Sequence, residues 1–381
     1  MTEPNMLGAY GPWAASLVAE GPGRLSFLRE EFRDVDAWRP LARKKLDELM
    51  LPPGNAEKPR AEVQHQFEYD GLQFDHLRWE LPYGPPTEAF FLKPAGATGK
   101  LPAVVALHDH GGNKYFGTRK IVDVGGAMHP MMKKHHDEYY GGLSWANALA
   151  KRGYGVLVHD AFLFGSRRVR YADLPEPYRK GRSEVQPDSE AEIKAYNTFA
   201  GEHESVAAKS LFCAGTSWPG VFVSEDRRAV DYLCGRDDVD ASRVGCAGLS
   251  GGGLRTVFLG GLDDRIRCAC CVGMMTTWKD YLLHKSYTHT WMVYVPGLPA
   301  WLDYPEILGL RVPLPTMVLN DSEDTLFSPS GMREADRMLA AVFKKAGAAD
   351  HYKGSFYPGP HKFDRPMQAE AFAWFDRWLK A

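Results

Sequence analysis

The sequence has little net charge and no long uninterrupted apolar run. Its 381 residues carry 46 Lys and Arg against 48 Asp and Glu, a formal charge of −2. This balance gives no electrostatic reason for a polyanionic partner, so we expect neither nucleic acid nor an anionic membrane surface to be bound through bulk charge. The absence of a run of about 18 apolar residues argues against a membrane-spanning helix.

Signals for export and for a disulfide framework are also missing. Residues 1 to 23 contain no basic segment followed by a continuous apolar stretch, which a secretory signal peptide would have. We therefore expect a cytoplasmic location. The six cysteines include Cys268, Cys270 and Cys271, which lie close together on an apolar run and are expected to be reduced core residues.

What is present is enough apolar material for a large core, with 44% hydrophobic and 12% aromatic residues. Residues 24 to 50 carry apolar positions at helical spacing and are followed by Pro52-Pro53-Gly54, which ends a helix. We predict an N-terminal helical arm over residues 1 to 60, with its helix divided at Pro40.

The order of predicted strands and helices in residues 61 to 381 indicates a single α/β catalytic domain. Short β-like runs come first, and apolar runs then alternate with helical segments from residue 101 onwards. The first part predicts an antiparallel start to a sheet, and the alternation predicts parallel strands with crossover helices. The expected fold class is therefore α/β, with a mostly parallel central sheet and helices on both of its faces.

Three stretches are too long to be ordinary connections, namely residues 113–142, 161–222 and 275–315. Insertions that follow strands of an open α/β sheet lie over the carboxyl edge, where ligands bind. The third insertion is rich in aromatic residues: Trp278, Tyr281, Tyr287, Trp291, Tyr294, Trp301 and Tyr304. These rings would suit a lid, a pocket wall or a subunit interface, and the sequence leaves the three options open.

The strongest chemical signal surrounds Ser250. The sequence Gly248-Leu249-Ser250-Gly251-Gly252 follows a β-like run and opens a helical segment, which is the setting of the nucleophile elbow G-x-S-x-G. The glycines two residues on either side matter because strand and helix approach so closely there that side chains would clash. We predict that Ser250 is a nucleophile.

An acid and a histidine should follow the nucleophile in that order, each after a later strand. The strand predicted over Thr316 to Leu319 leads into a turn with Asp321, Glu323 and Asp324, of which we choose Asp324. The other two acids stay open as alternatives and are expected to be solvated turn carboxylates. Of the two histidines that follow, His351 begins a predicted strand, whereas His361 lies in a loop beyond it and is the predicted base.

An oxyanion hole needs backbone N–H donors that are fixed in advance. The N–H of Gly251 is one, and the turn His108-Asp109-His110-Gly111-Gly112, which follows another predicted strand, offers the second. We choose His110, with Gly111 as the alternative. A metal site at this turn or at His135-His136-Asp137-Glu138 is less well supported, because no further ligand stands at a fixed spacing, and the latter segment is expected to be a polar loop.

From about residue 85 to 381 the chain resembles the dienelactone hydrolase and acetyl xylan esterase-like branch of the α/β-hydrolase superfamily. The resemblance rests on the turn at residues 108 to 112, the Ser250 elbow, and the loops of Asp324 and His361. It implies hydrolysis of carboxylic esters, often acetyl groups on sugars. Two features depart from the pattern: dienelactone hydrolases use a cysteine where this chain has Ser250, and the esterases usually carry a His-Gly-Tyr type turn.

The expected function is that of a serine carboxylic-ester hydrolase that works through an acyl-enzyme, without a cofactor or a metal. The expected partner is a small-molecule or carbohydrate ester, with neither nucleic acid nor membrane, and a homo-oligomer is left open. One alternative is an amidase or peptidase that uses the same three residues. Another is a catalytically silent α/β-hydrolase that serves as a binding protein.

Overall fold

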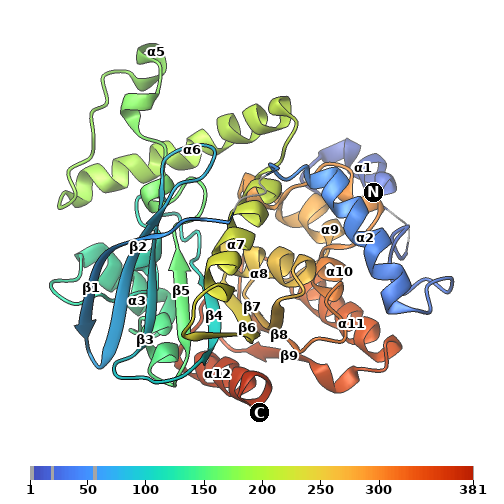
Figure 1. Ribbon diagram of the computed structural model, residues 1–381. Helices are drawn as coiled ribbons and strands as arrows, with labels where there is room; N and C mark the ends of the chain where they lie inside the picture. Colours follow the sequence, from blue (N-terminus) through green and yellow to red (C-terminus); the bar gives the residue numbers. More distant parts are fainter. Residues whose placement is uncertain (1–3, 19–20, 55–57, 381) are drawn as a thin grey trace.

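The computed structural model describes residues 4–18, 21–54 and 58–380. A nine-stranded sheet runs through the centre of the molecule, with the strand order β1-β2-β3-β5-β4-β6-β7-β8-β9 (Figure 1). The strands are β1 Glu62–Tyr69, β2 Leu72–Trp79, β3 Thr87–Pro94, β4 Leu101–Leu107, β5 Gly155–His159, β6 Val239–Leu249, β7 Ile266–Val272, β8 Thr316–Asp321 and β9 Tyr352–Tyr357.

The sheet begins as an antiparallel meander and continues as a parallel sheet. Strands β1, β2 and β3 pair antiparallel, and β3 also pairs antiparallel with β5. From β5 to β9 every neighbouring pair is parallel. The first hairpin turns at Asp70 and Gly71, whose φ angles of 52° and 75° suit a tight two-residue hairpin loop. The predicted antiparallel start and the predicted parallel sheet are both confirmed.

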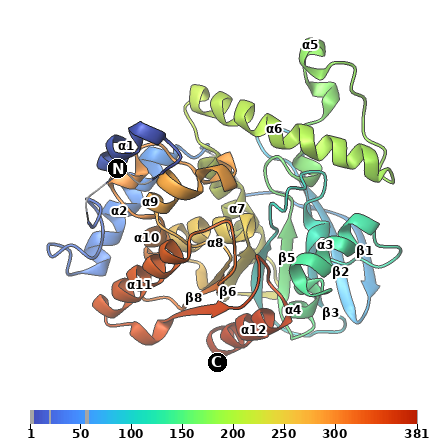
Figure 2. The same ribbon diagram turned by 180° about the vertical axis from the view of Figure 1, so that it is seen from behind.

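Helices cover both faces of the sheet. Helices α7 (Trp218–Cys234), α8 (Gly251–Leu262), α10 (Tyr304–Gly309) and α11 (Pro329–Lys345) lie on the face turned forward in Figure 1. Helices α3 (Pro130–Tyr140), α4 (Trp145–Ala150) and α12 (Arg365–Leu379) lie on the face turned forward in Figure 2. Strand β4 contributes Val105 to the first core and Val104 to the second, which is the two-residue alternation of a buried strand. The predicted α/β fold class is confirmed.

The N-terminal segment differs from its prediction in two ways. Its long helix, α2 (Val35–Met50), begins after Asp34, whose side chain accepts hydrogen bonds from two N–H groups of the first turn. Residues 24–34 form turns because their backbone bonds to the third insertion, for example from Leu25 N to the Trp301 carbonyl at 2.8 Å. Pro40 is the sixth residue of α2 and does not divide it.

The predicted insertions contain much of the additional helical structure. Residues 113–142 include the short helix η2 (Thr118–Lys120) and α3, and residues 161–222 include α5 (Glu176–Arg179) and the long α6 (Glu190–Ala214). Helix α7 begins at Trp218, at the end of the second insertion, and Ser217 caps it by accepting a hydrogen bond from Gly220 N. None of the helices among the described residues is long and apolar enough to cross a membrane.

Candidate active site

Ser250 lies in the turn between β6 and α8. Its φ and ψ angles are 57° and −118°, a backbone conformation that costs free energy for a residue with a side chain. Strain of this kind persists only where the surrounding structure enforces it. The Ser250 side chain consequently stands at the end of β6 and faces a cavity that it helps to line.

The two glycines that flank Ser250 at a distance of two residues are required by close backbone contacts. A Cβ added at Gly248 would lie 2.4 Å from the Leu107 carbonyl oxygen, and one added at Gly252 would lie 2.0 Å from the same atom. Both distances are far shorter than a carbon and an oxygen can approach. Helix α8 therefore packs against the end of β4 as closely as the G-x-S-x-G pattern requires.

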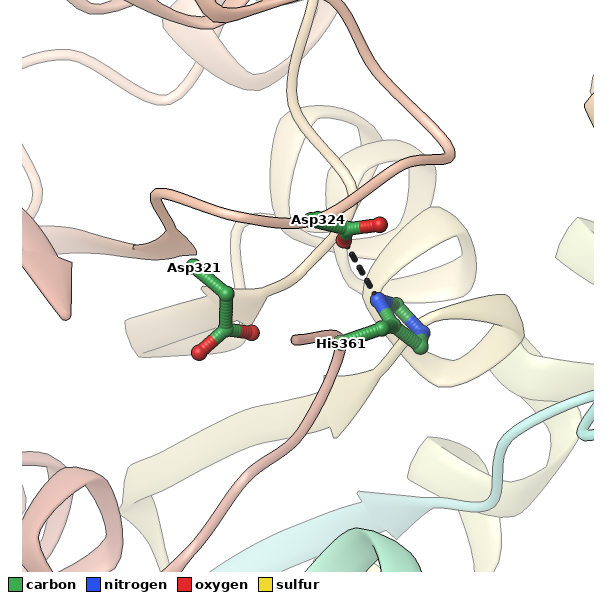
Figure 3. A group of neighbouring side chains, drawn as sticks. All are labelled: Asp321, Asp324 and His361. Carbon is green, nitrogen blue, oxygen red and sulfur yellow. Dashed lines mark hydrogen bonds and ion pairs between the residues drawn. The ribbon is translucent and has the colours of Figure 1, made fainter. Parts of the chain in front are cut away.

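Asp324 and His361 form a hydrogen-bonded pair (Figure 3). Asp324 Oδ2 lies 2.6 Å from His361 Nδ1, and the other carboxylate oxygen of Asp324 accepts a bond from Leu326 N at 2.9 Å. The Asp324 side chain is buried, whereas His361 lines the same cavity as Ser250. With Nδ1 bonded to the carboxylate, Nε2 is the ring nitrogen left to accept a proton.

The two alternative acids have other partners. Asp321, the last residue of β8, is fully buried and accepts a hydrogen bond from Lys362 N at 3.0 Å. Burial raises the pKa of its carboxyl to about 7. The expectation that Asp321 is a solvated turn residue is wrong, because β8 extends beyond its predicted end and pairs there with Tyr357 of β9. Glu323 is exposed, and its carboxylate accepts a bond from Gly359 N at 3.2 Å.

His351 does not reach this site. It lies in the turn before β9, whereas His361 follows that strand, and its Nδ1 lies 2.5 Å from the carbonyl oxygen of Pro313. The structure therefore places only His361 of the two candidate histidines at the carboxyl end of the sheet.

Gly273 is a site residue that the sequence reasoning missed. It follows β7 with a φ of 55°, and a Cβ added there would lie 2.9 Å from His361 Cε1. The absent side chain leaves room for the imidazole ring. A glycine directly after the strand that follows the elbow was the only signal for this role.

The turn after β4 approaches the elbow from the other side. A Cβ added at Gly251 would lie 2.8 Å from His110 N, so the backbone of these two residues is almost in contact. Among the described residues, the His110 N–H meets no hydrogen-bond acceptor. Gly251 N is the first N–H of α8, which finds no acceptor within its helix. The His110 N–H therefore lies beside the elbow, where the predicted second donor would have to be.

The side chains of this turn are held by residues of the insertions. His110 Nε2 lies 2.6 Å from Glu204 Oε1 of α6, and His110 Nδ1 accepts a bond from Gly112 N. Asp109 is buried and bonded to His135 Nε2 at 3.1 Å and to the Tyr140 hydroxyl. Burial alone would raise the pKa of Asp109, but the charges of His135 and Lys120 and these two hydrogen bonds hold it below its usual value.

The segment His135-His136-Asp137-Glu138 belongs to α3, so its prediction as a polar loop is wrong. The helix begins at Pro130, a residue favoured in the first turn, and both histidines are buried on its inner side. The sequence analysis did not predict this helix because residues 130–140 contain few apolar positions. Among the described residues, the group close enough to bind one metal ion is Asp321, Asp324 and His361.

A cavity of about 330 Å³ joins these groups. It is lined by Ser250, Gly251, His361, the turn residues 109–112, and an apolar wall that includes Leu254, Met274 and Leu326. The third insertion adds Thr288, His289, Thr290, Met292 and Val293. The cavity has the size of a small-ligand pocket and opens directly onto the elbow.

The aromatic residues of the third insertion do not line this cavity. Trp278, Tyr281 and Tyr304 are buried and pack against one another, with ring centroids 5.2–5.7 Å apart. Tyr287 and Trp291 are 70% and 41% exposed. The insertion thus forms one wall of the pocket with its residues Thr288–Thr290, Met292 and Val293. The buried aromatic rings pack beneath this wall and stabilise it.

His289 is a second pocket residue that the sequence reasoning did not single out. Its Nε2 lies 2.9 Å from the Leu326 carbonyl, and burial lowers its pKa to about 4. The ring is therefore neutral near pH 7, donates from Nε2, and keeps an acceptor at Nδ1.

Comparison with known proteins gives the fold a name. No family model matches the chain. A solved structure from Bacteroides fragilis NCTC 9343, named "putative acetyl xylan esterase", superposes with a TM-score of 0.65 at 17% identity, over 92% of this chain and 83% of the other. The chain has the α/β-hydrolase fold. A glucuronoyl esterase from Solibacter usitatus shares this α/β-hydrolase fold with a TM-score of 0.62 at 15% identity, over 94% of this chain and 98% of the other.

A curated sequence is also similar to this chain. It is "Putative hydrolase YtaP" of Bacillus subtilis (strain 168), 28% identical over 294 residues, which are 76% of this chain and 83% of the relative. The resemblance stated from the sequence is confirmed at the level of the α/β-hydrolase fold. The roles of Ser250, Asp324, His361, Gly251 and His110 stay predictions.

Proposed function

We propose that the protein is a serine carboxylic-ester hydrolase. The observation that carries this proposal is the convergence of three elements on one cavity: the strained Ser250 elbow, the imidazole of His361 bonded to Asp324 at 2.6 Å, and the backbone of His110 beside Gly251. A nucleophile, an oriented base and fixed backbone donors are the parts that acyl transfer needs.

The reaction has two steps. His361 Nε2 removes the Ser250 proton while the seryl oxygen attacks the ester carbonyl, and the oxyanion is stabilised by the N–H groups of Gly251 and His110. The intermediate expels the alcohol, which takes its proton from His361, and an acyl-enzyme remains. Water deprotonated by His361 then attacks this ester and releases the acid.

The substrate is proposed to be a small ester, including an acetyl group on a carbohydrate. The size of the cavity and its apolar wall support a short acyl or alcohol part. The esterase names of the structural neighbours agree with this choice. We also propose a cytoplasmic location, which is supported by the six free cysteines.

The test is hydrolysis of a panel of short-chain aryl esters, acetylated sugars and matched amides. Ser250→Ala should lower kcat by about 10³-fold or more on every ester that the wild type cleaves. Ser322→Ala, an exposed serine in the acid turn, is the matched control and should keep full activity. Near wild-type turnover by Ser250→Ala would refute the assignment, and faster cleavage of amides than of esters would favour the amidase.

A catalytically silent binding protein is the remaining alternative. A fluorophosphonate probe distinguishes it, because only an activated serine is phosphonylated at a useful rate. We expect rapid labelling of the wild type and none of Ser250→Ala. A wild type that resists the probe and cleaves no ester would support the binding protein.

A further inference from the structure

The side chain of Lys120 is a buried cation next to the turn after β4, and the reaction steps proposed above do not use it. Lys120, the last residue of η2, is fully buried. Its Nζ donates to the carbonyl oxygens of Asp109 and His110, each at 2.8 Å. An ammonium group without water is costly unless its protons are paired, and these two carbonyls supply that pairing.

The two bonds fix the direction of the N–H groups in the same peptides. The peptides after Asp109 and His110 are trans, so each N–H points opposite to its carbonyl. Because both carbonyls point at Lys120, the N–H groups of His110 and Gly111 both point away from it. The elbow lies on that side, since a Cβ at Gly251 would approach His110 N to 2.8 Å.

From this geometry we infer that Lys120 is a positioning residue that aligns and polarises the His110 N–H, the oxyanion donor that the turn after β4 contributes. The inference rests on the proposed function and adds to it a residue from the first insertion. A positive charge at the carbonyl end of a peptide draws electron density away from its N–H, which makes that group a stronger donor. The same charge attracts the oxyanion through the peptide.

The charge of Lys120 is set by its surroundings. Phe164 lies against the ammonium with its ring centroid 4.7 Å away, and Asp109 Oδ2 lies 3.9 Å away. The pKa of Lys120 is lowered to about 8, chiefly by burial and also by the charges of Lys114 and Arg255, while Asp109 and Asp160 oppose the shift. The neutral ring of His108 also lies nearby, since burial holds its pKa well below the usual value. The ammonium is therefore charged at pH 7 and loses its charge at moderately alkaline pH.

The test compares Lys120→Met, Lys120→Gln and Lys120→Arg with the wild type on one ester that the wild type cleaves. Lys120→Met should lower kcat roughly 10- to 100-fold, somewhat less than removal of an oxyanion donor, and leave KM within about twofold. Lys120→Arg, which keeps the charge and the donors, should recover most of the loss. Lys133→Met, an exposed lysine of α3, is the control and should behave as wild type.

A second readout reports on the oxyanion itself. An aryl trifluoromethyl ketone adds to the nucleophilic serine and forms a charged tetrahedral adduct, so its inhibition constant should rise in Lys120→Met by the same factor as kcat/KM falls. A structural defect that only lowered the amount of folded enzyme would reduce kcat without weakening the inhibitor. Should Lys120→Met not fold, Lys120→Gln and the decline of wild-type kcat above pH about 8 provide the same test.

The outcomes separate this inference from the function it rests on. An active wild type with unchanged kcat and inhibitor affinity in Lys120→Met and Lys120→Gln would overturn the role of Lys120 and leave the esterase proposal intact. A wild type without esterase activity, or an active Ser250→Ala, would overturn the proposed function. A parallel loss of kcat and inhibitor affinity, with recovery in Lys120→Arg, is the result expected here.

Discussion

The sheet and the insertions contribute to the site in different ways. Ser250, Asp324 and His361 stand on turns that directly follow β6, β8 and β9, so the hydrogen bonds of the sheet place them. Lys120 and Glu204 come from the insertions and reach the turn after β4 only through their side chains. The positions of the proposed reacting groups therefore depend on the backbone of the fold, whereas their surroundings depend on individual side-chain contacts. We expect substitutions of the proposed reacting groups to lower the rate far more than substitutions in the insertions.

The largest effect is expected for the acid of the sheet edge. Asp324→Asn keeps the size of the side chain but removes the charge that orients and stabilises the imidazolium of His361, so kcat should fall by roughly 10²- to 10⁴-fold. His361→Ala should lose a similar amount, because residues that act as one unit are not additive. Steady-state kinetics with an aryl ester measures both.

The matched controls are Asp321→Asn and Glu323→Gln. Neither carboxylate bonds to His361, and both side chains instead bond to the backbone of the loop that carries it. Both variants should stay within about tenfold of the wild-type rate, since the isosteric amides still accept these bonds. An inactive Asp321→Asn beside an active Asp324→Asn would mean that the acid has been assigned to the wrong residue.

A smaller loss of kcat is expected when Glu204, a residue of the second insertion, is substituted. Burial alone would raise its pKa, but the bond from His110 and the charge of Lys114 hold it at about 2, so the carboxylate is charged at working pH. Glu204→Ala leaves the His110 ring without this partner and should lower kcat about tenfold, whereas Glu204→Gln still offers an acceptor and should lose less. Kinetics at equal folded-enzyme concentration gives both values.

His203→Ala is the control on the same turn of α6. His203 is also buried, but its ring bonds to the Tyr178 hydroxyl at 3.0 Å and does not line the cavity at Ser250. The kcat of His203→Ala should equal that of the wild type. A loss of 10³-fold or more in Glu204→Ala, as large as that of a reacting group, would break the distinction between sheet and insertions.

The same distinction explains what could be predicted from the sequence. Ser250 and His361 could be predicted because glycine spacing and a position after a strand are local signals of backbone geometry. Lys120 and Glu204 carry no such signal. Glu204, for example, contacts His110, which lies 94 positions earlier in the chain. A glycine often marks a close contact, but the sequence does not show which group it contacts. The role of Gly273 becomes clear only when the structure places the His361 ring beside it.

The acid turn shows where local reasoning fails within the sheet. Asp321 was predicted to be solvated because polar residues after an apolar run usually mark the end of a strand. Pairing with β9 continues to Asp321 and buries it, and a pairing between strands distant in sequence has no local signature. Residues 24–34 fail for a related reason, because contacts with Trp301 override their helical spacing.

The raised pKa of Asp321 leads to a prediction about how the stability of the protein depends on pH. Its folded-state pKa of about 7 lies above the value of about 3.9 for an unfolded aspartate, so the folded protein holds a proton that the unfolded chain releases. The contribution of this group to stability is therefore lost as pH rises between about 4 and 7, and it stays constant above that range. Asp321→Asn should gain stability relative to wild type, on the order of 1 kcal/mol, between pH about 5 and 7.

Urea unfolding at several pH values measures this difference, and Glu323→Gln, on the exposed side of the same turn, is the control. The relevant quantity is the difference between variant and wild type, because it cancels the titration of all other groups. A difference that stays flat from pH about 5 to 8 would show that Asp321 ionises as in the unfolded chain.

The smallest expected effect is that of a chelator, for which we predict no change in esterase activity. Ligand atoms of Asp321, Asp324 and His361 all lie within 4.8 Å of one another, so a metal ion at the sheet edge is a specific alternative. However, Asp324 Oδ2 and His361 Nδ1 lie 2.6 Å apart, whereas two ligands of a tetrahedral zinc ion at 2.0–2.2 Å are separated by about 3.4 Å. A metal would have to break this bond and with it the orientation of the imidazole. Activity lost with EDTA and restored by a divalent ion would show that the sheet edge binds a metal ion rather than supplying a base.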